Sequence, residues 1–324
     1  MGHDHAHDDG HDHPHGHAHD HGHGGHSHGH HAPPSTFDAA FAWGAGLNAA
    51  FVLAQVAAGL FAHSTALLAD AVHNLGDVLG LVLAWVAAVL ARRSPSPGRT
   101  YGWGRSTVLA SLANAAVVLL GCGAILLEAG EKLFHPAPVD GLLVVVVAAV
   151  GILVNGGTAL LFARGRHGDM NIRGAFVHMV GDAAVSAGVV VAALLIMLTG
   201  LAWIDPLASL VIVVVVVAGT WRLGRDSVNL ALDAVPGGID ARQVEATLKA
   251  LPGVAEVHDL HVWALSTTVS ALTAHLVRTE DADADAIVRT ACAAVRPLGI
   301  AHATVQVETT GLARECQLRP AEVV

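Results

Sequence analysis

Six apolar segments, each long enough to cross a lipid bilayer, constrain the fold of this chain more than any other feature. A hydrocarbon core about 30 Å thick needs about 20 helical residues at about 1.5 Å of rise per residue. The segments run near Phe37–Phe61, Leu67–Ala91, Thr107–Glu128, Gly141–Ala163, Ile172–Leu198 and Pro206–Leu223. A hydrophobic share of 53% and a mean hydropathy of +0.54 fit lipid as the solvent. We therefore predict an α-helical membrane protein with six transmembrane helices.

Arginines in alternate connections indicate how these helices are oriented. The connections after the second, fourth and sixth segments carry Arg92, Arg93, Arg99, Arg105, Arg164, Arg166, Arg173, Arg222 and Arg225. The other connections carry only Lys132. By the positive-inside rule the arginine-bearing connections face the cytosol. An even number of spans then puts both termini in the cytosol, and we predict a multi-pass protein of the cytoplasmic (inner) membrane.

The regions on either side of the transmembrane domain, residues 37–225, differ in composition. Residues 1–36 contain 14 of the 23 histidines, interleaved with glycine and aspartate, and cannot bury an apolar core, so we expect a disordered, histidine-rich cytosolic arm. Residues 226–312 have the composition of a soluble domain, and residues 313–324 are interpreted as a tail. The formal net charge of −10 argues against a nucleic-acid partner, which would need an excess of lysine and arginine.

The soluble region predicts the element order α-β-β-α-β. Its helical and strand patterns fall at Asp240–Ala250, Val254–Leu265, Val269–Val277, Asp283–Val295 and Ala303–Thr309. Helices covering one face of a small mixed sheet would suit this order. Cys122, Cys292 and Cys316 are far apart and lack CxxC spacing, so we predict neither a disulfide framework nor a thiolate zinc finger.

Two matching pairs of ionisable residues lie inside the predicted spans. His73 and Asp77 are in the second span, His178 and Asp182 in the fifth, and each pair is separated by four residues and so shares one helical face. An ionisable residue within a span costs about 2.5–3.5 kcal/mol on insertion scales, so function is the first hypothesis. From the rise per residue, both pairs approach the midplane, where they could meet at one level.

Two imidazoles and two carboxylates would form a four-coordinate site that suits tetrahedral zinc better than magnesium or calcium. The alternative is that each pair only forms interhelical hydrogen bonds. Asn74 lies on the same face and could support the site. Asp70 could guide the ion or orient His73, or could be a plain helix N-terminal carboxylate.

A second group of candidate ligands lies in the soluble region. It comprises His258, Asp259, His261, His275, Gln306 and Glu308. His258 and His261 are an odd number of residues apart and would point to opposite faces of an ideal strand. Both can therefore join one site only near a strand end or a bulge. A regulatory metal site and ordinary strand histidines both remain open at this point.

Five segments in order resemble the cation diffusion facilitators, specifically the zinc-transporting branch of that family. They are HSTALLADAVHNLGD, TYGWGRSTVLASLAN, AFVHMVGDAAVSAGVV, WIDPLASL and EVHDLHVWAL. The resemblance extends from about Phe37 to Glu308. The family's transport motif, HxxxD on spans two and five, falls on His73, Asp77, His178 and Asp182.

The resemblance implies a homodimer with a cytosolic α+β ferredoxin-like domain, and exchange of outgoing Zn²⁺ for incoming protons. It also implies that zinc is a regulatory ligand of a cytosolic site that uses His258, His261, His275 and Glu308. Gln306 stands where some relatives have a ligating histidine. Some relatives bind a further metal between spans two and three, but residues 92–105 contain no histidine or aspartate, and we expect no such site.

We therefore predict a zinc efflux transporter whose partners are divalent metal ions, protons, the lipid bilayer and a second copy of the chain. Two other functions were weighed. A membrane-anchored zinc buffer or sensor would bind metal mainly through the arm. An intramembrane metallohydrolase would need an open coordination position and a general base, and no HExxH motif is present. We expect no enzymatic activity.

Overall fold

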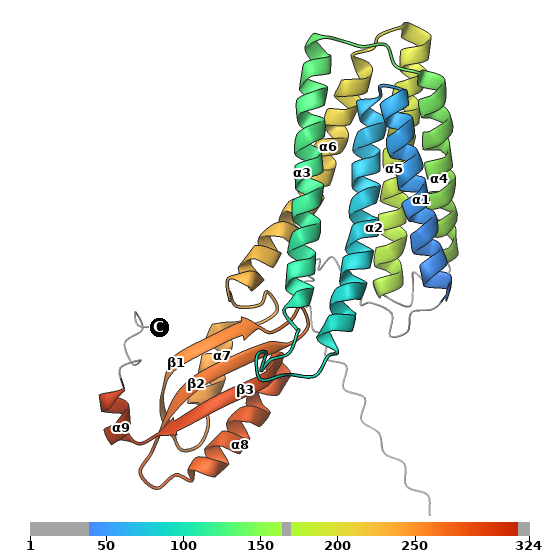
Figure 1. Ribbon diagram of the computed structural model, residues 1–324. Coiled ribbons are helices and arrows are strands. Elements are labelled where there is room, and N and C mark those ends of the chain that lie inside the picture. Colours follow the sequence, from blue (N-terminus) through green and yellow to red (C-terminus); the bar gives the residue numbers. More distant parts are fainter. Residues whose placement is uncertain (1–38, 164–169, 317–324) are drawn as a thin grey trace, which may run out of the picture. The chain divides into compact units, whose positions relative to one another are not determined.

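The computed structural model describes residues 39–163 and 170–316 (Figure 1). The predicted histidine-rich arm, the connection with Arg164 and Arg166, and most of the predicted tail lie outside the described residues.

Six long helices occur where the apolar segments predict them. They are α1 (Ala39–Phe61), α2 (Thr65–Ala91), α3 (Ser106–Phe134), α4 (Gly141–Ala163), α5 (Met170–Thr199) and α6 (Ile204–Ala231). Five of them, α2 to α6, are long and apolar enough to cross a membrane. In α1 the apolar part that was tested, Gly46–Phe61, is shorter. The predicted multi-pass helical fold is confirmed.

Two of these helices extend beyond their apolar segments. α3 continues past Glu128 to Phe134, and Lys132 pairs with Glu128 at 2.8 Å one turn earlier. α6 continues past Leu223 to Ala231 and thus crosses the expected domain boundary at residue 225. Charged pairs at helical spacing favour additional turns that a hydropathy pattern does not detect.

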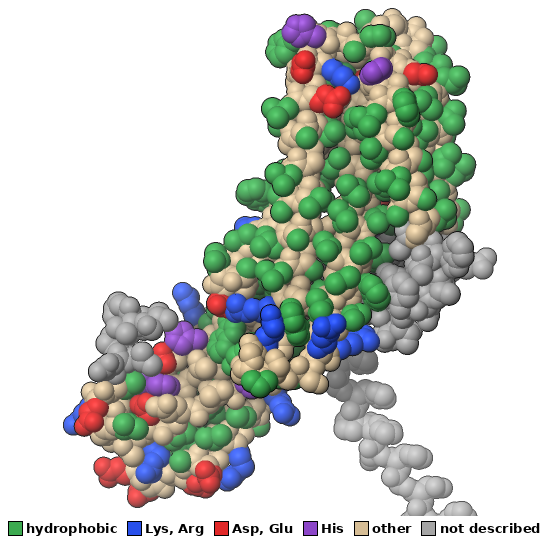
Figure 2. All heavy atoms as spheres, viewed as in Figure 1, with side chains coloured by type: hydrophobic (Ala, Val, Ile, Leu, Met, Phe, Trp, Pro, Cys, Tyr) green, Lys and Arg blue, Asp and Glu red, His purple; other side chains and the backbone are tan. Residues whose placement is uncertain are grey.

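The bundle has an apolar exterior and places α2 near its centre. α2 contacts α1, α3, α5 and α6. Hydrophobic side chains cover much of the visible bundle surface, and charged side chains lie towards its ends (Figure 2). Leu120, Leu127, Leu153 and Leu160 are each at least 74% exposed. Such an apolar surface would be unfavourable in water and is suited to lipid.

The beginning of α2 is held by a carboxylate from α6. Asp205 is buried, and its oxygens accept hydrogen bonds from Ser64 Oγ (2.5 Å), Thr65 Oγ1 (2.6 Å) and the backbone N–H groups of Thr65 (2.6 Å) and Ala66 (3.4 Å). Free N–H groups at a helix N-terminus need acceptors, and a negative charge there is favourable. Asp205 thereby fixes the first turn of α2, one to two turns before His73.

The C-terminal residues form a small sheet covered by helices, which we call the sheet domain. Its elements are α7 (Ala241–Lys249), β1 (Val254–Ala264), β2 (Ser270–Arg278), α8 (Ala284–Val295), β3 (Ile300–Glu308) and α9 (Thr310–Glu315). The strand order is β1-β2-β3, antiparallel between β1 and β2 and parallel between β2 and β3. α7 and α8 contact each other and share one core with the strands, formed around Val244, Leu248, Leu276 and Ile300.

The predicted α-β-β-α-β order is confirmed, and the structure adds α9. This helix was not predicted, and it lies across the expected boundary between the domain and the tail at residue 312. Thr309 caps it by accepting a hydrogen bond from the Leu312 N–H at 3.3 Å, and Ala313 is buried. α9 contacts β2 and β3.

Candidate metal centres

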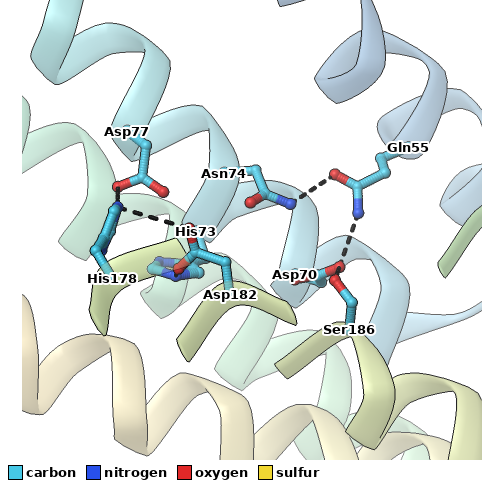
Figure 3. A network of polar contacts seen from close by, with 8 residues as sticks. All are labelled: Gln55, Asp70, His73, Asn74, Asp77, His178, Asp182 and Ser186. Carbon is cyan, nitrogen blue, oxygen red and sulfur yellow. Dashed lines mark hydrogen bonds and ion pairs between the residues drawn. The ribbon is translucent and has the colours of Figure 1, made fainter. Parts of the chain in front are cut away.

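Four side chains from α2 and α5 face one another inside the bundle (Figure 3). We call them the transport cluster, after the transport motif that the resemblance described above would place on them. They are His73, Asp77, His178 and Asp182, the residues of the two HxxxD pairs. The four-residue spacing places each pair on one face of its helix. The contacts cross between the helices: His73 Nε2 is 2.9 Å from Asp182 Oδ1, and His178 Nε2 is 3.3 Å from Asp77 Oδ1.

The donor atoms of the transport cluster are close enough for a shared cation. Single ligand atoms of His73, Asp77 and Asp182 all lie within 4.8 Å of one another. His178 is outside this tightest group, but its Nε2 is 3.6 Å from Asp182 Oδ2 as well as near Asp77. Asp182 therefore contacts both imidazoles, and Asp77 contacts that of His178. Nitrogen and oxygen donors in this number suit a tetrahedral zinc ion.

A network of uncharged polar groups and one carboxylate lies beside the transport cluster (Figure 3). The buried Asp70 Oδ2 accepts hydrogen bonds from Gln55 Nε2 on α1 at 2.8 Å and from Ser186 Oγ on α5 at 3.0 Å. Asn74 on α2 donates to Gln55 Oε1 at 2.9 Å. Asp70 thus connects α2 with α1 and α5 through hydrogen bonds. Its role in guiding the ion or orienting His73 stays a prediction.

A second cluster of donors lies in the sheet domain, and we call it the strand cluster. It consists of His258 on β1, His275 on β2, Glu308 at the end of β3 and Cys316 just after α9, with single ligand atoms all within 4.8 Å of one another. His275 Nδ1 is 3.1 Å from Glu308 Oε1, and His258 Nε2 is 3.4 Å from Glu308 Oε2. Gln306 does not join the donors and instead donates a hydrogen bond to Glu308 Oε1 at 2.8 Å.

The bulge that two ligands from β1 would require is present, yet His261 remains outside the strand cluster. The register of β1 against β2 shifts between His258 and His261, and Asp259 has a φ of 49°. His261 Nε2 is 2.8 Å from Asp259 Oδ1, and Asp259 Oδ2 is 3.5 Å from His275 Nε2. His261 is therefore connected to the cluster only through Asp259. Direct ligation by His261 stays a prediction.

Comparison with known sequences identifies the family. Residues 43–230 match the cation efflux transmembrane domain, and residues 236–310 match the cytoplasmic domain of cation efflux proteins. The chain belongs to the cation efflux family. This confirms the family that the sequence motifs indicated, and the family is one of transporters.

Several bacterial cation efflux proteins are similar over most of their length. The zinc transporter ZitB of Escherichia coli is 34% identical over 292 residues, covering 87% of this chain and 92% of the relative. The metal cation efflux system protein CzcD of Cupriavidus metallidurans is 34% identical over 253 residues, covering 78% and 79%. The cadmium, cobalt and zinc/H⁺-K⁺ antiporter of Bacillus subtilis is 30% identical over 264 residues, covering 80% and 85%.

Sequence reasoning missed two residues at or near these sites. Asp205 was visible only as an acidic residue at the start of the sixth span, and its role depends on the position of α2. Cys316 was set aside because it has no cysteine partner at ligand spacing. No local pattern could have found it, because its neighbours in space are residues 258, 275 and 308.

Proposed function

We propose that this chain exports zinc from the cytoplasm in exchange for protons, using the transport cluster as the site that binds both. The observation that carries the proposal is the crossed pairing of His73 with Asp182 and of His178 with Asp77 between α2 and α5. Two helices that each supply an imidazole and a carboxylate can hold a dication with neutral overall charge. The names of the relatives, which include a zinc transporter and a zinc antiporter, support the same ion.

The contacts in the transport cluster explain why zinc and protons would compete. A carboxylate only accepts hydrogen bonds, so the 2.9 Å contact of Asp182 Oδ1 with His73 Nε2 needs a proton on that nitrogen. A metal ion bound at the same nitrogen must displace this proton, which a neutral ring can move to Nδ1 and an imidazolium releases to water. In the proposed exchange the histidine is an imidazolium when zinc is absent. When zinc leaves, a proton on a histidine would offset part of the charge of two carboxylates inside the membrane. Zinc release and proton uptake are therefore linked at the same atoms.

The direction of export follows from a proposed orientation with both termini in the cytosol of a bacterial inner membrane. Arg92 and Arg93 at the end of α2, Arg105 before α3, and Arg222 and Arg225 near the end of α6 support it, since arginines favour the cytosolic side. In this orientation the sheet domain is cytosolic. The domain boundaries at residues 36, 225 and 312 remain part of this proposal.

We also propose a homodimer and a regulatory metal in the sheet domain. The family resemblance motivates both, with His258, His261, His275 and Glu308 as the ligands expected from sequence. Two features of the domain support a metal: donors from three strands converge, and Glu308 is almost fully buried beside two imidazoles. Dimer mass in detergent, measured by light scattering, would test the assembly.

The proposed function is tested with purified protein in liposomes that contain a pH-sensitive dye. An imposed zinc gradient should move zinc and drive protons the opposite way, and Asp77→Asn should abolish both fluxes. Glu128→Gln is the matched control, because it neutralises a carboxylate of a transmembrane helix outside the cluster and should retain both.

Two results would contradict the proposal. Zinc flux without proton counterflow and without pH dependence between about 6 and 8, where histidine titrates, would replace antiport by facilitated diffusion. Zinc flux in Asp77→Asn equal to that of the unmodified protein, at equal amounts in the membrane, would remove the transport cluster from the mechanism.

A further inference from the structure

The strand cluster contains buried polar atoms that have no hydrogen-bond partner. His258 is 8% exposed, and neither of its ring nitrogens has a hydrogen-bond partner. Glu308 is 1% exposed, and its Oε2 atom also lacks a hydrogen-bond partner, although His258 Nε2 lies 3.4 Å away. Burying such groups unsatisfied costs free energy, and a buried carboxylate costs more than a neutral group. A cation between His258 Nε2 and Glu308 Oε2 would give each of these two atoms a partner.

The thiol of Cys316 lies beside these atoms. Its Sγ is 3.7 Å from His275 Nδ1, the nitrogen that also faces Glu308 Oε1 at 3.1 Å. Each of the four residues of the strand cluster thus directs a donor at a common region less than 5 Å across. One sulfur, two nitrogens and one carboxylate oxygen make a donor set typical of tetrahedral zinc.

We propose that Cys316 is a thiolate ligand and that it completes, with His258, His275 and Glu308, a four-donor site for a thiophilic divalent cation such as zinc or cadmium. The inference rests on the regulatory site proposed above for its location and changes its ligand set. Sulfur replaces His261 as the fourth donor. A thiolate favours zinc and cadmium over manganese and magnesium, which prefer oxygen.

The residues around His275 fit this assignment. With Nδ1 directed at the cation, the other ring nitrogen, Nε2, faces Asp259 Oδ2 at 3.5 Å. Histidine ligands commonly have a carboxylate at the second nitrogen, which fixes the orientation of the ring. His261 in turn pairs with Asp259 at 2.8 Å. Asp259 and His261 would therefore position His275 without touching the metal.

The sulfur comes from a part of the chain that follows the matched cytoplasmic domain. The match to the cytoplasmic domain ends at residue 310, at the first residue of α9, and Cys316 follows the last residue of that helix. α9 contacts β2 and β3, which brings the thiol to His275. A bound cation would thus attach α9 to the sheet.

Cobalt spectroscopy of the full-length protein in detergent tests the ligand directly. Thiolate coordination to Co²⁺ gives a near-ultraviolet charge-transfer band, whereas the histidines and carboxylates of the arm and the transport cluster give none. We expect this band in the unmodified protein, its loss in Cys316→Ser, and its retention in Cys122→Ser and Cys292→Ser. No band in the unmodified protein, or a band that survives Cys316→Ser, would overturn the proposal.

Thiol labelling provides a second measurement that does not depend on transport. In a variant whose only cysteine is Cys316, zinc should slow maleimide labelling several-fold and manganese should not. His275→Gln should abolish this protection, and Asp77→Asn should leave it intact. Equal labelling rates with and without zinc would refute ligation. If zinc does not slow labelling but zinc transport is observed, the cysteine site is wrong and the transport proposal stands. If zinc slows labelling but no transport is observed, the transport proposal is wrong and the cysteine site stands.

Discussion

Asp77 and Asp182 each face a histidine of the other helix, but their surroundings differ. The Asp182 side chain is 4% exposed and lies near both imidazoles, while the Asp77 side chain is 36% exposed and lies near His178. In the proposed site, a buried carboxylate in contact with two histidines is the better placed of the two to hold the ion. A more exposed carboxylate is better placed to meet an ion on its way in or out.

At the residue scale, we expect Asp182→Asn to weaken zinc binding more than Asp77→Asn. Residues that only hydrogen-bond to a metal ligand typically change metal affinity about 10–100-fold when mutated. Loss of Asp182, a proposed ligand itself, should therefore lower zinc affinity at least about 100-fold. Calorimetric titration of protein lacking residues 1–31 measures this without interference from the arm. Glu128→Gln should bind like the unmodified protein, and equal losses in the two aspartate variants would contradict the assigned difference in role.

The two histidines should set the metal preference. His73→Asp or His178→Asp replaces a borderline imidazole by a hard oxygen donor, which favours manganese relative to zinc. We expect the ratio of manganese flux to zinc flux to rise about tenfold, equivalent to about 1.4 kcal/mol. Competition between the two ions in liposomes measures the ratio. An unchanged ratio in both variants would indicate that neither histidine binds the ion directly.

The residues of the transport cluster were predictable because each HxxxD pair is local in sequence. Four-residue spacing states which residues share a helical face, and the cost of burying charge suggests a function for them. The spacing does not state how α2 and α5 are displaced along their axes. The pairing of His73 with Asp182 rather than another partner therefore had to come from the structure. The proximity of Cys316 to the strand cluster arises only from tertiary contacts, so no sequence pattern predicts it.

At the scale of elements, α2 packs closely against α3 through a glycine that lies directly before Asp77. A Cβ atom on Gly76 would lie 2.5 Å from Val118 Cγ2. Small residues at helix interfaces let the backbones approach closely within a membrane. The position of Asp77 therefore depends on residue 76 being glycine.

We expect Gly76→Ala to reduce both the thermal stability of the protein and its zinc flux. Overpacking of this kind costs about 1–3 kcal/mol, and α2 would have to shift at the transport cluster. Gly123→Ala on α3 is the matched control, because a Cβ there meets nothing within 4 Å. The double variant Gly76→Ala with Val118→Ala should recover part of the loss. Failure of any recovery would argue against the proposed contact as the cause.

The ends of the elements were harder to predict than their positions. Apolar runs located all six long helices, yet α3 extends to Phe134 and α6 to Ala231 through turns that contain charged residues. These turns are stabilised by pairs such as Glu128 with Lys132, which a hydropathy window counts only as polar. α9 was missed for a similar reason, because its six residues show no amphipathic pattern long enough to detect.

At the scale of the whole molecule, most histidines lie either in the N-terminal arm or in the two clusters described above. Residues 1–31 contain 14 histidines, which are mostly neutral near pH 7 because the usual histidine pKa is about 6.5, and so can bind zinc weakly at many points. A tethered collection of weak sites raises the local supply of an ion without altering the buried site.

Removal of Met1–His31 should therefore raise the zinc concentration for half-maximal transport several-fold and leave the maximal rate nearly unchanged. Flux measured over a range of zinc concentrations in liposomes checks this. In a control variant the histidines of the arm are replaced by asparagine, so that the arm keeps its length but loses its imidazoles. This control distinguishes an effect of metal binding from an effect of chain length. Loss of all transport in the truncated protein would favour the buffer function, in which the arm does the essential binding.

The capping of α2 by Asp205 has a mechanical consequence. Four hydrogen bonds join the first residues of α2 to the first turn of α6, so these two helix ends cannot separate without leaving a buried carboxylate unsatisfied. A change of access at the transport cluster that preserves these hydrogen bonds would keep the first turns of α2 and α6 together and confine any separation of the two helices to their other ends. The described residues of α5 meet α2 near the transport cluster through side-chain contacts of His178, Asp182 and Ser186, which can be exchanged without breaking the capping of α2.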